Sequence, residues 1–138
     1  MAAITGIAHV ELSVRDLDLS SPWYCALLGA TEVFRETKEE HGRRDAVIRD
    51  PESGLILAFT EHREYEGAFQ VMRAGLDHLS FAVASANELD AWSTKLDQLG
   101  IAHSPVRDYG YALAITFDDP DGIALELFWT KPRPPRAT

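Results

Sequence analysis

The sequence predicts an α+β fold in which one βαβββ module occurs twice in tandem and forms a mostly antiparallel sheet. A repeated strand pattern is the first observation behind this prediction. Ile7–Val14 matches Leu76–Val83, and the match aligns His9 with His78. Both stretches alternate apolar and polar residues with a period of two, which is typical of strands with one buried face.

A helix is predicted after each repeated strand. In the second module Ser85 and Glu88 have the spacing of a capping box, in which each side chain binds a free backbone N–H. In the first module we expect Asp18 to cap the helix and Pro22 to fall near its first turn. Gly29 is expected to end that helix.

The end of each module is also repeated. Asp50–Phe59 matches Asp119–Phe128, and each segment predicts a tight turn followed by an apolar strand. The middle strands are expected at about 32–35, 46–49 and 112–117. Together these segments give the order strand, helix and three strands twice.

We expect a single domain that spans all 138 residues. The first module covers 5–60 and the second 76–130, with a polar connection at 61–75. The stretch 131–138 is rich in basic residues and proline and has no apolar face. It is expected to be a flexible tail, as chain termini commonly are.

The composition excludes several classes of partner. The formal charge of −9 argues against a nucleic-acid partner, because phosphate contacts need a basic surface. No apolar run approaches the roughly 18 residues of a membrane span, and no signal-peptide pattern begins the chain. We therefore expect a cytoplasmic protein whose partner is a small molecule.

Strand parity places His9, His78 and Glu126 on one face of the sheet, opposite the apolar side chains. Two imidazoles and one carboxylate suit several divalent ions and leave coordination positions open for a substrate. We therefore expect one Fe, Mn, Ni, Co or Zn ion. Two simpler alternatives are hydrogen-bonded strand histidines and a solvent-facing glutamate, although the repeat positions favour a joint site.

Three stretches, Ala8–Leu17, Asp77–Phe81 and Phe117–Glu126, resemble the vicinal oxygen chelate superfamily. That superfamily includes glyoxalase I, methylmalonyl-CoA epimerase, fosfomycin-resistance transferases, type I extradiol dioxygenases and bleomycin-resistance proteins. The resemblance covers nearly the whole chain except its tail. It implies a cupped sheet around a cleft, and a metal ion that accepts two neighbouring substrate oxygens. It also implies a symmetric homodimer, since sheet edges must be paired or covered.

The chain departs from each named branch of that superfamily. Ala58 stands where glyoxalase I and the epimerase carry a fourth metal ligand. Thr116 stands where extradiol dioxygenases carry a tyrosine, and Glu11 where fosfomycin transferases carry a threonine. Bleomycin-binding proteins generally lack the metal triad that this chain retains.

The preferred function is metal-dependent lyase, isomerase or group-transfer chemistry on a small substrate with adjacent oxygens. The alternatives are a non-catalytic, small-molecule-binding resistance protein and an extradiol-type dioxygenase. Glu11 is the candidate general base, although it could instead support a ligand histidine or simply face solvent. We expect the substrate to be lined by the remaining residues of this face and its loop: Ser13, Ser80, Tyr109, Tyr111, Thr116 and Phe128.

Overall fold

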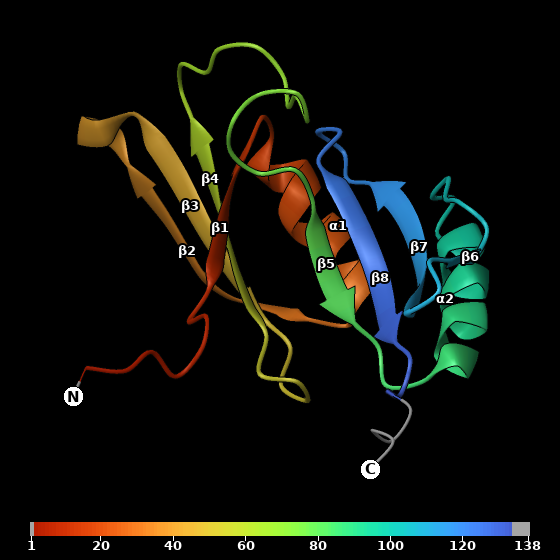
Figure 1. Ribbon diagram of the computed structural model, residues 1–138. Coiled ribbons are helices and arrows are strands. Elements are labelled where there is room, and N and C mark those ends of the chain that lie inside the picture. Colours follow the sequence, from red (N-terminus) through yellow and green to blue (C-terminus); the bar gives the residue numbers. More distant parts are fainter. Residues whose placement is uncertain (1, 134–138) are drawn as a thin grey trace. The chain divides into compact units, whose positions relative to one another are not determined.

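The computed structural model describes residues 2–133, which form two compact units that meet in sequence between Gly67 and Ala68 (Figure 1). The first unit contains β1 (Val10–Val14), α1 (Leu17–Leu28), β2 (Thr31–Lys38), the short 3-10 helix η1 (Glu39–His41), β3 (Arg43–Arg49) and β4 (Ile56–His62). The second contains β5 (Leu79–Ala82), α2 (Ala86–Gln98), β6 (Arg107–Asp108), β7 (Ala112–Asp118) and β8 (Ala124–Thr130). The predicted α+β fold of two βαβββ modules is confirmed.

Each unit folds into one four-stranded sheet in which the first and last strands are neighbours. The strand orders are β1-β4-β3-β2 and β5-β8-β7-β6. The pairs β1–β4 and β5–β8 are parallel, and all other paired strands are antiparallel. In each unit, the strand that follows the repeated turn pattern therefore runs beside the strand that follows the histidine.

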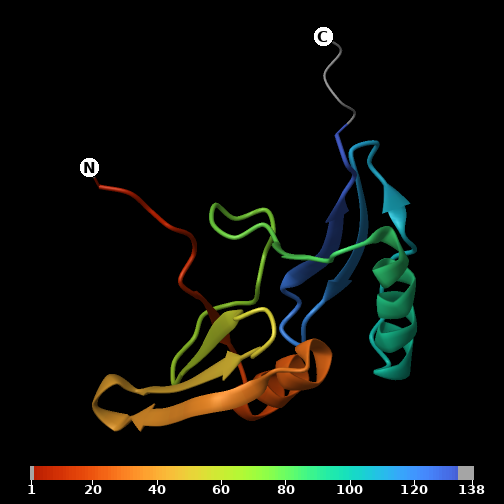
Figure 2. The ribbon, with the colours of Figure 1, turned by 90° about the horizontal axis from the view of Figure 1, so that it is seen from below.

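The apolar face predicted for each sheet is buried. Leu12 and Val14 of β1 and Phe59 of β4 are at most 4% exposed. Tyr24 of α1 packs on Phe59 with ring centroids 4.8 Å apart, so the helix covers this face of its sheet (Figure 2). The second unit buries an equivalent set from α2, β7 and β8: Leu89, Leu96, Ile115, Leu125 and Leu127.

The start of α1 differs from the prediction. Asp16 caps the helix, because its Oδ1 accepts hydrogen bonds from two first-turn N–H groups at 2.9 and 3.2 Å. Asp18 was therefore the wrong choice of cap, since it lies inside the first turn and pairs with arginines. Pro22 lies in the second turn, where its missing N–H removes one intrahelical hydrogen bond. Gly29 ends the helix in a left-handed conformation, as predicted.

The predicted capping box of α2 is only half formed. Ser85 occupies the cap position, but its hydroxyl makes no cap hydrogen bond to the described first turn. Glu88 folds back and accepts from the backbone N–H of Ala84 at 3.1 Å, one residue before the cap. The glutamate alone therefore satisfies a backbone donor at this helix start.

The first strand of each unit is shorter than the sequence pattern suggested. Because β1 begins at Val10 and β5 at Leu79, His9 and His78 each lie one residue before a strand instead of inside it. Both histidines are exposed. Glu11 lies within β1 and is also exposed, which agrees with the predicted alternation.

The C-terminal stretch begins with an anchored residue. The Nζ of Lys131 lies 2.7 and 2.8 Å from the two carboxylate oxygens of Asp108, and its backbone N–H donates to the carbonyl of Tyr111. Lys131 is therefore held by two contacts, while residues 134–138 of the predicted tail lie outside the described part. Over the described residues, no helix is long and apolar enough to cross a membrane.

A cluster of ion pairs fastens α1 to β3 and β4. Arg44 contacts both carboxylate oxygens of Glu61, at 2.6 and 3.1 Å, and also reaches Asp18 at 3.0 Å. Glu61 further accepts from the backbone N–H of Leu17 at 2.7 Å. The hydrogen bond from Arg44 lowers the pKa of Glu61 below its ordinary value, despite the opposing effect of burial.

We predict that Glu61→Gln destabilises the protein at neutral pH and not in acid. The free pKa of glutamate is about 4.3. Because the folded pKa is lower, the stabilisation is complete above that value and is lost as pH falls through the folded pKa. The variant should lose about 1–2 kcal/mol of unfolding free energy at pH 7 and much less near pH 3, measured by denaturant titration. Glu52→Gln, in an exposed turn, is the matched control, and an equal loss for Glu61→Gln at both pH values would contradict the assignment.

Candidate functional site

The second unit places three predicted site residues in one row across its sheet. Strand pairing aligns Ser80 of β5, Glu126 of β8 and Thr116 of β7. Residues paired in this way project from the same face of a sheet. The hydroxyl of Ser80 donates to Oε1 of Glu126 at 2.9 Å, and the Glu126 side chain is only 12% exposed. This carboxylate is therefore held in place by a neighbouring strand.

His78 lies at the end of this row. Its Nδ1 is 2.6 Å from Oδ1 of Asp77, and its Nε2 is 3.7 Å from Oε1 of Glu126. A carboxylate partner favours the hydrogen on Nδ1, which leaves the Nε2 lone pair free. The 3.7 Å separation is too long for a hydrogen bond. The two groups form an ion pair when His78 is protonated and present two donor atoms to a cation when it is neutral.

Aromatic side chains border the same face. A pocket of about 330 Å³ is lined by Ser80, Phe128 and Trp129 together with small alanines of β5 and the following turn. Tyr111 contacts Phe128 with ring centroids 6.2 Å apart, whereas Tyr109 is 45% exposed at the hairpin before β7. Phe128 thus lines this pocket and Tyr111 lies against Phe128, whereas Tyr109 is not among the residues that line the pocket.

The first unit holds His9 and Glu11 in a pocket of its own. This pocket has a volume of about 220 Å³. Its other lining residues come from β2, β3 and β4: Phe34, Asp45, Ala46, Val47, Ile56 and Ala58. Glu11 is paired across β1 and β4 with Ala58, so it stands beside the position where the sequence lacks a fourth ligand. Ser13 is paired with Thr60, one row further along, and does not line this pocket.

Two buried polar residues lie behind Glu11. The Oγ1 of Thr60 is 2.5 Å from Oε1 of Glu11 and 2.9 Å from Oδ1 of Asp45. Asp45 also meets Arg43 at 3.0 Å and Lys38 at 3.2 Å. Burial alone would raise the pKa of Asp45, but the hydrogen bond from Thr60 and the two cations lower it below its usual value. Asp45 is therefore a charged residue whose negative charge is balanced by Arg43, Lys38 and the hydroxyl of Thr60.

Asp45, Thr60 and Asp77 were not among the site residues predicted from the sequence. The first two share the face of Glu11 in the strand register, but that register is a property of the folded sheet. Asp77 directly precedes His78, whereas Ala8 precedes His9. That difference between the repeats was the signal for a histidine with its own carboxylate partner.

The donor chemistry of the second unit fits a divalent cation. His78 and Glu126 offer one nitrogen and one carboxylate, and each is oriented by a hydrogen-bond partner of its own. Within the described residues, no group of three His, Cys, Asp or Glu side chains lies close enough to hold an ion in either unit. His9, the remaining predicted ligand, belongs to the first unit.

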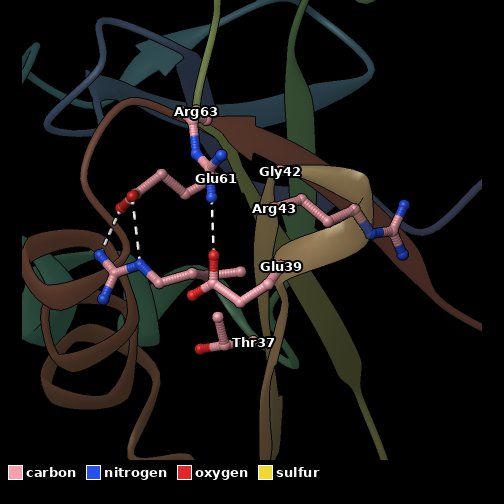
Figure 3. A pocket seen from close by; sticks show the side chains of 7 residues that line it. Thr37, Glu39, Gly42, Arg43, Glu61 and Arg63 are labelled. Atoms are coloured by element: carbon pink, nitrogen blue, oxygen red, sulfur yellow. Dashed lines mark hydrogen bonds and ion pairs between the residues drawn. The ribbon is translucent and has the colours of Figure 1, made fainter.

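A third hollow, of about 150 Å³, lies beside the β2–β3 turn and the end of β4 (Figure 3). Three arginines line it, but each faces a carboxylate. Arg63 contacts Glu39 at 2.7 Å, and the other two, Arg43 and Arg44, pair with Asp45 and Glu61. The positive charge of this hollow is thus largely compensated, which disfavours an anion site.

Comparison with known proteins gives the same fold. The chain is 35% identical to a glyoxylase/bleomycin resistance protein/dioxygenase domain from Frankia sp. EAN1pec, with a TM-score of 0.85 and 94% of both chains covered. It shares the fold of FosX, the fosfomycin resistance protein of Listeria monocytogenes that was crystallised with Mn(II) and sulfate. That comparison has a TM-score of 0.69 at 20% identity, with 94% of this chain and 95% of FosX covered.

Two sequence relatives come from Bacillus subtilis. MhqA is 30% identical over 129 residues, and catechol-2,3-dioxygenase is 26% identical over 131. These alignments include 88% and 94% of this chain, but the chain spans only 39% and 43% of the length of the two relatives. The profile of the Glyoxalase/Bleomycin resistance protein/Dioxygenase superfamily matches residues 6–127. The chain therefore belongs to the glyoxalase/bleomycin resistance protein/dioxygenase superfamily.

Proposed function

We propose that this protein is a divalent-metal-dependent enzyme that binds a small substrate through two adjacent oxygens. The observation that carries the proposal is the pairing of His78 with Glu126. Their donor atoms face each other at 3.7 Å without a hydrogen bond, while Asp77 and Ser80 orient them from behind. Glu126 is partly buried and has one hydroxyl donor, so a cation would add the charge partner that such a carboxylate favours.

In this proposal His78 and Glu126 hold the ion, and His9 of the first unit stays the third ligand predicted from the sequence. FosX, which has the same fold, was crystallised with Mn(II), so the fold is compatible with such an ion. When bound, the ion would supply Lewis-acid stabilisation of negative charge on the substrate oxygens. The protein side chains then have the remaining tasks of binding and orienting the substrate and moving its proton.

Glu11 is the proposed general base. It lines the same pocket as His9, and its strand neighbour Ala58 leaves space beside it. The apolar side chains of Phe34, Val47 and Ile56 complete this pocket, which would shield a bound substrate from water. Ser80, Phe128 and Tyr111 are proposed to contact the substrate from the second unit, and Thr116 would lie in the same row.

A ring-cleaving dioxygenase is the second candidate. The similarity to catechol-2,3-dioxygenase of Bacillus subtilis favours it, although this chain spans 43% of that protein's length. Against it, Thr116 offers a hydroxyl but no phenol at the position where the extradiol pattern expects tyrosine. Lyase, isomerase or transferase chemistry therefore remains our first choice.

A homodimer and a cytoplasmic location stay predictions. The eight-residue edge strand β2 supports the dimer, since Val33 and Phe34 on it are 59% and 49% exposed. Exposed edge strands with apolar side chains are usually paired or covered.

We predict that the protein binds about one Mn(II) per chain. His78→Ala and Glu126→Ala should each weaken Mn(II) binding roughly 100-fold or more, because a direct ligand contributes more than its supporting partner. The loss of Mn(II) electron paramagnetic resonance signal on titration measures the affinity. His62→Ala and Glu52→Ala are matched controls on exposed residues. Unchanged affinity in both site variants would rule out the proposed ligand set.

Asp77→Asn should weaken Mn(II) binding roughly tenfold, since an asparagine orients the imidazole of His78 less strongly than a carboxylate does. The same titration measures this effect. Asp90→Asn, on the exposed surface of α2, should leave the affinity unchanged. If Asp77→Asn binds Mn(II) like the parent protein, Asp77 has no role in orienting the ligand.

The reaction is tested with α-hydroxythioesters, epoxides and catechols, each supplied to protein loaded with Mn(II) or Fe(II). We expect turnover of one oxygen-bearing class, and Glu11→Gln should lose about 100-fold in turnover while it keeps the metal. Oxygen consumption with catechol would establish the dioxygenase instead. Stoichiometric binding without turnover would identify a binding protein.

A further inference from the structure

We infer that Thr60 positions the carboxylate of Glu11 for proton transfer. The inference rests on the base role proposed above for Glu11. Thr60 is not a proposed metal ligand, and it does not line the pocket that holds Glu11. It acts through Glu11.

The contacts form a continuous chain across three strands. Thr60 of β4 lies between Ser13 of β1 and Asp45 of β3 in the strand register, one row beyond Glu11. Its hydroxyl reaches Oε1 of Glu11 at 2.5 Å and Oδ1 of Asp45 at 2.9 Å. Thr60 is 3% exposed and Asp45 6%, so both contacts are sheltered from water.

The hydroxyl of Thr60 has only one hydrogen for these two carboxylates. Asp45 has other donors, because Arg43 and Lys38 both contact its Oδ2 at 3.0 and 3.2 Å. Glu11 has no such additional donors, since Thr60 is the one side chain among the described residues that donates a hydrogen bond to it. Asp45 and Glu11 therefore compete for this hydrogen, and the two cations still compensate Asp45 when the hydrogen is on Glu11.

This arrangement fixes one oxygen of Glu11 and leaves the other available. Oε1 is tied to Thr60, whereas Oε2 has no hydrogen bond to any described residue. A free glutamate side chain has several rotatable bonds, and holding it costs conformational entropy unless a neighbour fixes it. A base fixed before the substrate arrives is a general source of catalytic efficiency.

A purely structural role for Thr60 and Asp45 makes a different prediction. In that case Thr60 would satisfy buried Asp45, and the loss of its hydroxyl would have the same effect whether or not Glu11 is present. Coupling between Thr60 and Glu11 is therefore the property to measure. It is measurable in the metal-free protein, independently of any reaction.

The first experiment is a double-mutant cycle on unfolding of the metal-free protein, with Thr60→Val and Glu11→Ala. We expect non-additive effects that correspond to about a three- to tenfold change in the unfolding equilibrium constant. Thr60→Ser should restore the coupling, and Thr37→Val on exposed β2 should show none. Additive effects would overturn the inference, whatever the fate of the proposed function.

The second experiment uses 4-nitrocatechol, whose colour reports the loss of its hydroxyl protons. The probe is added to Mn(II)-loaded protein at a pH where the free compound is mostly protonated. Thr60→Val should keep Mn(II) affinity within about twofold but bind the deprotonated probe roughly tenfold less well, and Thr60→Ser should recover it. Thr60→Ala, which also lacks the hydroxyl, provides a second variant with the same expected loss if Thr60→Val does not fold.

The two experiments separate the two claims. If the cycle shows coupling but Glu11→Gln deprotonates the probe like the parent protein, the base role fails and the inference fails with it. If Glu11→Gln loses deprotonation but neither Thr60→Val nor Thr60→Ala does, the base role stands and the positioning role is overturned.

Discussion

The parallel pairing of the first and last strands in each unit is the constraint on which the rest of the structure depends. It brings the segment after each histidine beside the strand that closes the unit. Parallel neighbours cannot be joined by a hairpin, so the helix and the two middle strands must lie between them in sequence. The order of elements and the position of the candidate sites both follow from this pairing.

The two units pair their first and last strands in the same way, but the carboxylate lies on the first strand in one unit and on the last strand in the other. In the first unit the carboxylate is Glu11, on the first strand, and it faces Ala58. In the second unit it is Glu126, on the last strand, and it faces Ser80. Each unit thus presents one carboxylate in the same row beside its histidine. The neighbours of the two groups differ, since Thr60 holds Glu11 whereas Ser80 and His78 adjoin Glu126.

The sequence was sufficient to predict the elements and the polar face, because both depend on local periodicity. Alternation in Ile7–Val14 and in the strand that contains Glu126 has a physical cause, since one face of each strand is covered by a helix. The helix caps were less predictable. Asp16 and Asp18 are chemically equal candidates, and the choice between them depends on where Arg44 and Glu61 lie after folding. The contact of Thr60 with Glu11 joins residues 49 positions apart, so only strand register reveals it.

The positions of the histidines have a mechanical consequence. His9 and His78 precede the first hydrogen-bonded rung of their strands, whereas Glu11 and Glu126 lie within the ladder. A backbone that is not held by a ladder can shift by small rotations at little cost, while the paired strands resist such shifts. Each unit therefore combines an adjustable imidazole with a rigid carboxylate. At the proposed metal site, such a combination would follow differences in ionic radius without disturbing the core, so the expected tolerance of several ions would come from the backbone as well as from the donor atoms.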